Sequence, residues 1–95
     1  MIAERRGLLT LDAAEALAVE AFAWLAGEPD ALARFLNNAG IDPSALRSAA
    51  ADRGFLVGVL DFVTGENALL VAYSSRAGIR AEQVVAARRT LNGYD

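Results

Sequence analysis

The sequence contains no cysteine, no histidine and no lysine; all nine of its basic residues are arginine. Without cysteine there is no disulfide framework and no thiolate chemistry. Without histidine the commonest general base and metal ligand is missing as well. The serines occupy segments of helical or capping character and have no base near them in the sequence: Ser44, Ser48, Ser74 and Ser75. We therefore predict that the protein is not an enzyme and has no cofactor, no catalytic residue and no metal site.

Long apolar runs are also missing. Uncharged stretches such as residues 55–60 and 67–75 are too short to cross a bilayer. Residues 1–7 lead into no compact apolar segment with a small-residue cleavage site, so no secretory signal is evident. With 95 residues, 55% of them hydrophobic and 22% charged, the chain has the composition of a globular protein. We predict one domain over residues 1–95, located in the cytoplasm and away from membranes, with flexible ends at 1–10 and 92–95.

Apolar residues recur at steps of three and four along most of the chain, and glycines punctuate the pattern. This predicts an all-α protein, a compact bundle of five or six short helices. The expected helices begin near residues 12, 29, 43, 55, 67 and 81. The predicted core stripes are Ala14, Leu17, Ala18, Ala21 and Leu25; Leu32, Phe35, Leu36 and Ala39; Leu46 and Ala49; Leu56, Val59, Leu60 and Val63; Leu69, Leu70 and Tyr73; and Val84, Val85 and Leu91.

Helix ends are predicted from capping residues. Gly27, Gly40, Gly65 and Gly78 each follow an apolar stripe and should end a helix; we expect a left-handed conformation at Gly27 and positive φ at Gly40 and Gly78. Thr10 or Asp12 can cap the first helix, and Asp12 with Glu15 has the spacing of a capping box. Pro29 suits a first helical position, and Asn67 is a predicted N-cap.

Part of the sequence recurs at an offset of 38 residues. When residues 21–50 are laid over 59–88, seven of thirty positions are identical. The identical positions are Gly27, Glu28, Leu32, Ala39, Gly40, Ile41 and Ala49, paired with Gly65, Glu66, Leu70, Ala77, Gly78, Ile79 and Ala87. Recurrence of helix stops and large apolar positions together predicts two related three-helix halves.

Nearly the whole chain, from about residue 12 to 91, resembles a small alphaproteobacterial family catalogued as a domain of unknown function. The resemblance rests on Gly27-Glu28-Pro29-Asp30, Arg34-Phe35-Leu36, Ala39-Gly40-Ile41-Asp42-Pro43, Leu46-Arg47, Phe55-Leu56 and Val59-Leu60-Asp61-Phe62. These positions are caps and core residues. The resemblance therefore implies a compact helical fold and supplies no substrate, cofactor or catalytic residue.

The second copy also resembles the turn of a bacterial helix-turn-helix, because Ala77-Gly78-Ile79 is followed by Val84 six residues after the glycine. Residues 80–92 would then form the helix that reads the major groove. Arg88 and Arg89 would meet phosphates, with Glu82 and Gln83 near base edges. The alternative is a glycine-capped helix hairpin with no role in DNA binding, which gives the same spacing.

Charge is unevenly distributed along the chain. Residues 68–94 carry a net charge of +3 and the remainder −6, within a total of −3. The basic C-terminal hairpin contains Arg76, Arg80, Arg88 and Arg89, which we predict to form a patch for an anionic partner surface. A solvated helix face is the alternative interpretation. We expect a non-catalytic protein-interaction module with a protein partner; nucleic-acid binding through residues 80–92 is the second hypothesis, and self-association is compatible with both.

The sequence leaves open whether Asp61 and Trp24 are buried or exposed. Asp61 lies inside the apolar run of residues 59–63 but to one side of its helical stripe, so we expect a boundary or exposed carboxylate. The aromatic side chains are predicted to fill the core. If Trp24 were instead exposed together with Phe22, they would mark a binding face.

Overall fold

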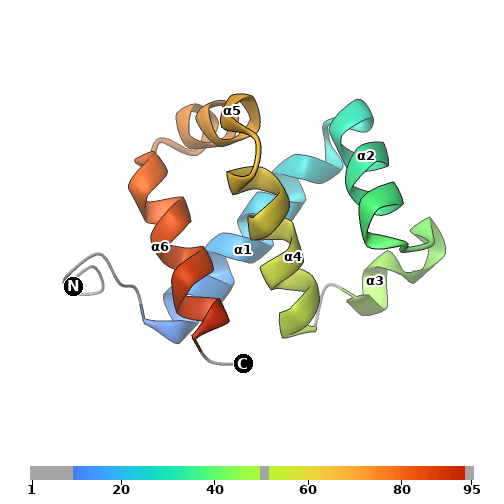
Figure 1. The fold of residues 1–95 in the computed structure, drawn as a ribbon, viewed down its shortest axis with the longest axis horizontal. Helices are drawn as coiled ribbons and strands as arrows, with labels where there is room; N and C mark the ends of the chain where they lie inside the picture. The colour runs from blue at the N-terminus through green and yellow to red at the C-terminus, as the bar shows by residue number, and fades with distance from the viewer. Residues whose placement is uncertain (1–9, 50–51, 94–95) are drawn as a thin grey trace.

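The computed structural model describes residues 10–49 and 52–93, and these form six α-helices and one 3-10 helix without a strand (Figure 1). The helices are α1 (Leu11–Ala26), α2 (Pro29–Ala39), η2 (Pro43–Ala45, the 3-10 helix), α3 (Leu46–Ala49), α4 (Arg53–Thr64), α5 (Asn67–Ala77) and α6 (Ala81–Asn92). The prediction of an all-α bundle is confirmed. Of the predicted flexible ends, residues 1–9 and 94–95 lie outside the described residues, whereas Thr10 caps α1 and Asn92 ends α6.

The core lies where α1, α4 and α6 meet. Helix α1 crosses behind α4, and α6 packs along both (Figure 1). The largest fully buried side chains are Leu25, Leu60, Leu91, Val59, Val63 and Val84, all from these three helices. Three alanines of α1 are completely buried, and their small side chains permit close approach of the partner helices: Ala14, Ala18 and Ala21.

The apolar stripes predicted most of this core. Leu17, Leu32, Leu36, Leu46, Ala49, Leu69, Leu70 and Val85 are half-buried rather than enclosed. Ala39 was wrongly placed in the core; it is exposed because the C-terminal half of α2 stands away from the middle of α4. Asp61 is exposed, as expected.

The aromatic side chains form two groups of ring contacts, one of phenylalanines and one of Trp24 with Tyr73. Phe35 packs against Phe55 and Phe62, with ring centroids 5.6 and 5.5 Å apart. Trp24 is half-buried and lies 5.5 Å from the ring of Tyr73, so it does not form an exposed face with Phe22. Among the described residues, the exposed large apolar side chains are Val19 and Val71.

Two of the predicted caps are wrong. Thr10 caps α1 by accepting a hydrogen bond from the Ala13 N–H at 3.1 Å, so Asp12 does not form a capping box with Glu15. Glu15 instead accepts a hydrogen bond from the Arg53 guanidinium on α4, at 3.2 Å. Asn67 is already the first residue of α5 and Glu66 takes the N-cap position without a side-chain hydrogen bond.

The glycine conformations divide into two classes. Gly40 and Gly78 have φ of 68° and 71°, which confirms the left-handed ends predicted for α2 and α5. Gly27 has φ of −91°, so the left-handed conformation predicted there is wrong. Its N–H still bonds to the Trp24 carbonyl at 3.0 Å, and the chain turns directly into Pro29 without a reversal of handedness.

The sequence recurrence corresponds to matching local geometry. Helices α2 and α5 both have 11 residues and are offset by 38 positions. The residue after each terminal glycine packs back in the same way: Ile41 N–H donates to the Leu36 carbonyl and Ile79 N–H to the Ser74 carbonyl, both at 3.1 Å. Beyond this point the two copies diverge, since the first continues as η2 and α3 and the second as the 12-residue α6.

No single helix among the described residues is long and apolar enough to cross a membrane. Helices α4 and α5 pass a test of length and composition only when taken together, and they are bent by 106° at their junction. The same composition is expected of a core helix, and α4 buries six of its side chains inside the bundle.

Candidate interaction surface

Helix α6 buries one side and presents the other. Val84, Ala87 and Leu91 are fully buried against the core. The opposite side carries a shallow hollow of about 380 Å³ lined by Ala81, Glu82, Val85 and Arg89. We call these four residues the α6 outer face. The split follows from helical periodicity, because residues 81, 85 and 89 lie on one side and 84, 87 and 91 on another.

The structure separates the four arginines predicted as a patch. Arg76 is exposed in the last turn of α5 and Arg89 is exposed in the last turn of α6. Arg80 directly precedes α6; its side chain is 79% exposed and lies 3.7 Å from the Glu82 carboxylate. Arg88 points elsewhere, toward α4. Three of the four therefore remain on the outer surface of the α5–α6 hairpin.

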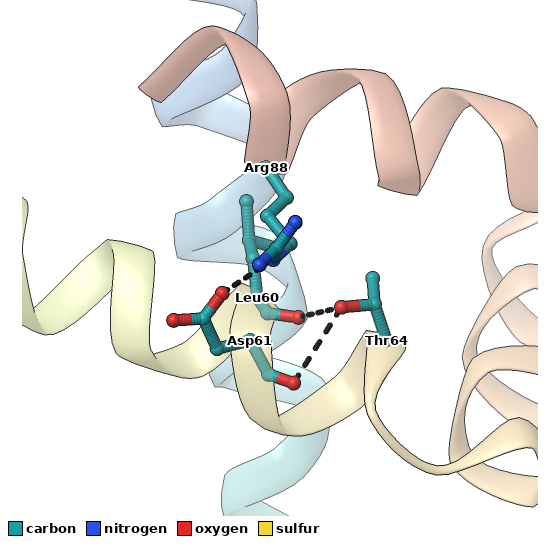
Figure 2. A network of polar contacts seen from close by, with 4 residues as sticks. All are labelled: Leu60, Asp61, Thr64 and Arg88. Atoms are coloured by element: carbon teal, nitrogen blue, oxygen red, sulfur yellow. Dashed lines mark hydrogen bonds and ion pairs between the residues drawn. The ribbon is translucent and has the colours of Figure 1, made fainter. Parts of the chain in front are cut away.

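Arg88 forms an ion pair with Asp61 that joins α6 to α4 (Figure 2). The Arg88 Nε–H donates to the Asp61 carboxylate, and both side chains stay about half exposed. Close by, the Thr64 hydroxyl donates to the Leu60 carbonyl at 2.7 Å, so it satisfies a backbone acceptor in the last turn of α4. Because exposed pairs are screened by solvent, this pair contributes at most about 1 kcal/mol. Its main effect is to occupy Arg88.

The charges around the outer side of α6 are mixed. Arg80 and Arg89 are nine residues apart, about 13 Å and half a turn out of phase along a helix, and the exposed Glu82 lies between them in the sequence, beside Arg80. Ala81 and Val85 lie between them, and both are half-buried. Arg89 forms no ion pair with any residue in the described part of the chain. The outer side of α6 thus combines two half-buried apolar side chains with the exposed side chains of Glu82 and Arg89.

A second hollow, of about 290 Å³, lies between α2 and α4. Its lining residues are Phe35, Asn38, Ala39, Gly58, Asp61 and Phe62. Gly58 occupies the middle of α4, and a Cβ atom placed there would meet nothing within 4 Å. The sequence pattern does not indicate this hollow; its one signal is a glycine inside an otherwise strong helical pattern.

A protein-family model described as "Protein of unknown function (DUF3572)" matches residues 11–94. The chain belongs to the DUF3572 family. No curated protein and no solved structure matches it significantly. The match spans all of α1 to α6, which agrees with the resemblance read from the caps and core positions.

The helix-turn-helix hypothesis can be compared with the α5–α6 hairpin of this DUF3572 chain. The turn has the expected left-handed Gly78. The following helix is enclosed on more than one side, however, since Ala86 and Thr90 are buried in addition to its core stripe. Gln83, expected near base edges, instead accepts a hydrogen bond from the Arg80 backbone N–H at 3.2 Å. The outward side chains left for a groove include the acidic Glu82.

The titratable groups of this DUF3572 chain include two with altered pKa values, and both lie away from the α6 outer face. Burial raises the pKa of the Tyr73 hydroxyl, with a further contribution from the negative charge of Glu20. Hydrogen bonds from the Ser44 backbone and hydroxyl lower the pKa of Asp42 at the start of η2. The described residues contain no cluster of three or more potential metal ligands.

Proposed function

We propose that this protein is a small non-catalytic protein-interaction module that contacts its partner through the α6 outer face. The observation that carries the proposal is the hollow on this face, where Ala81 and Val85 lie beside the exposed Arg89, which has no ion pair within the described residues. Protein interfaces combine an apolar centre with a polar rim, and arginine is enriched in them. A long guanidinium side chain also binds carboxylates in a defined orientation.

The expected partner is acidic. The hairpin of residues 68–94 carries a net charge of +3 on a chain of net charge −3, so it is the local site to which an anionic surface is attracted. Arg76 extends this positive region beyond α6. A cytoplasmic location belongs to the same proposal, as expected for a small charged module that meets another protein in solution.

The test is affinity purification of the tagged protein from its native host at low salt. We expect a reproducible protein partner that is lost from the double variant Arg80→Glu with Arg89→Glu. Arg88 is left unchanged, because a glutamate there would face Asp61 and disturb the fold. The control is Arg34→Gln on α2, which removes an arginine that is also exposed and also paired, to Glu66, without placing two carboxylates together. A partner that survives the double variant and is equally retained by the control would refute the proposed surface.

Nucleic-acid binding through residues 80–92 is the second candidate, and the Gly78–Ile79 turn is the observation that favours it. A DNA reader should bind duplex with an affinity that falls steeply as salt is raised, because each neutralised phosphate releases counterions. Fluorescence anisotropy with a random-sequence duplex, at several salt concentrations, distinguishes the two candidates. The interaction module should show no salt-dependent DNA binding at all.

A further inference from the structure

We infer that residues 28–49, which comprise α2, η2 and α3, open as one unit from a core of α1, α4 and α6 that stays folded. We call this segment the arm. In Figure 1 the arm lies on the opposite side of the molecule from α6. The inference concerns a different part of the protein from the proposed function and does not depend on it.

The arm buries few of its side chains. Helix α2 has 11 residues and buries two of them, Ala31 and Phe35. Helix η2 buries none, and Leu46 and Ala49 of α3 are half-buried. Helix α4, by comparison, buries six side chains along 12 residues. Because a segment with few buried apolar contacts opens at a low free energy, the arm should open more readily than the core.

Helix α5 also buries two side chains, but it is held at both ends. Short turns at Gly65 and Gly78 join it to the core helices α4 and α6, and it packs against both of them. Helix α2 packs against α1, from which the chain enters it, and only sparsely against α4. The arm can therefore move away while α1, α4 and α6 keep their contacts with one another.

The packing between the arm and α4 is incomplete. Gly58 of α4 and Ala39 of α2 both line the hollow of about 290 Å³ between these helices. A Cβ atom at Gly58 would meet nothing within 4 Å, and Ala39 is exposed. Surfaces separated by open space gain no dispersion energy from each other, so this part of the contact does little to hold α2 in place.

Arg34 fastens the arm at its surface. Its guanidinium forms an ion pair with the carboxylate of Glu66, which directly precedes α5. The central carbon of the same guanidinium lies 5.6 Å from the centroid of the Phe62 ring on α4. Both members of the ion pair are about half exposed. An exposed pair shifts an opening equilibrium by up to about fivefold, which favours the closed arm without locking it.

Opening uncovers aromatic rings that the closed protein hides. Phe35 of the arm packs against Phe55 and Phe62 of α4, and Phe55 is only 7% exposed in the closed protein. Phe22 of α1 keeps its own contact with Phe55, at 5.1 Å between ring centroids, because both lie outside the arm. The arm is thus a lid, latched by Arg34, over an apolar surface formed by α1 and α4.

The experiment is amide hydrogen exchange of the full chain, followed by NMR at increasing concentrations of urea below the unfolding transition. We expect the amides of residues 32–39 to be at least about tenfold less protected than those of the α4 and α6 core, and to share one level of protection. Their exchange should also depend less on urea, because opening the arm exposes less surface than global unfolding. The single tryptophan, Trp24, packs on Tyr73 of α5, so its fluorescence checks that the core stays folded.

Matched variants test the latch. Arg34→Gln should speed exchange of the α2 amides about two- to fivefold and leave the α4 and α6 amides unchanged. Glu66→Gln should have the same effect on α2, and the double variant should add little to either. The control is Arg88→Gln, which breaks an equally exposed pair between α4 and α6 and should leave the α2 amides unchanged.

Three results would overturn the inference. The first is that the α2 amides share the protection and the urea dependence of α4, which would make the protein a single cooperative unit. The second is protection that falls gradually toward one end of α2, which would indicate fraying. The third is an equal response of the α2 amides to Arg34→Gln and Arg88→Gln, which would show that Arg34 does not latch the arm.

Discussion

The two copies of the recurrent sequence reach the same local geometry and then end differently. Helices α2 and α5 share their length, their left-handed terminal glycine and the back-packing isoleucine. The third helix of the second copy is a full member of the core, whereas α3 has four residues and touches the core from its edge. At the offset of 38, the buried Leu91 corresponds to Arg53. An arginine does not extend an apolar stripe into the core; Arg53 instead begins α4 and pairs with Glu15 of α1.

The largest expected effect is on stability, and it distinguishes α6 from α3, the third helices of the two copies. Leu91→Ala should lower the free energy of unfolding by about 2–4 kcal/mol, because it leaves a cavity at a completely buried site. Leu46→Ala in α3 should cost about 1 kcal/mol, since Leu46 is only half-buried. Urea denaturation of both variants measures the difference. Equal losses would mean that α3 contributes to the core as much as α6 does.

The shared helix ends should respond alike. Gly40→Ala and Gly78→Ala each place a side chain at positive φ, at a cost of about 1 kcal/mol. Neither added Cβ would touch another atom within 4 Å, so the cost is conformational at both sites. Gly27→Ala, at negative φ, is the control and should cost much less. Thermal melts measure these losses. Very different losses for Gly40→Ala and Gly78→Ala would show that the two helix ends differ energetically despite their similar φ angles.

The glycine that opens the α2–α4 hollow has no counterpart in α1, where the offset position is Glu20. Gly58→Ala should stabilise the protein by about 0.5–1 kcal/mol, because alanine is the better helix former and its methyl group meets open space. Chemical denaturation tests this. A loss of stability would indicate that α2 moves closer to α4 in solution than in the structure.

The smallest effect concerns Tyr73, which corresponds to Phe35 in the first copy. Its hydroxyl is buried and has no hydrogen-bond partner within the described residues, so Tyr73→Phe should change stability at neutral pH by less than about 1 kcal/mol, in the stabilising direction.

The stability difference between wild type and Tyr73→Phe should be larger at alkaline pH than at neutral pH. Burial raises the pKa of Tyr73 in the folded state, so the folded protein holds this proton more tightly than the unfolded chain. Stability is therefore retained below the ordinary tyrosine pKa and lost as the pH rises above it. Tyr73→Phe should reduce this alkaline loss in a pH series of melts; an unchanged alkaline limb would assign the loss to other groups.

Periodicity and capping predicted the helices because both depend on residues close in the sequence. Leu56, Val59, Leu60 and Val63 were correctly placed in the core by their spacing alone. The prediction of Asn67 as an N-cap was wrong by one residue, because α5 already begins at Asn67. The position at which a helix begins depends on the turn at Gly65 and on the packing of α5, and neither is encoded by Asn67 alone. The same limit applies to the candidate surface: nothing local to Arg88 indicates that Asp61, 27 residues earlier, would occupy it.

The pairing of α1 with α6 also constrains how the chain can fold during synthesis. Helix α1 packs against α4 and most extensively against α6, so its apolar side is only partly covered until α6 is in place. Chains that lack α6 therefore expose part of a core side that α6 covers in the folded protein. A product truncated before α6 should therefore be recognised by chaperones and proteases more readily than a chain that contains α6.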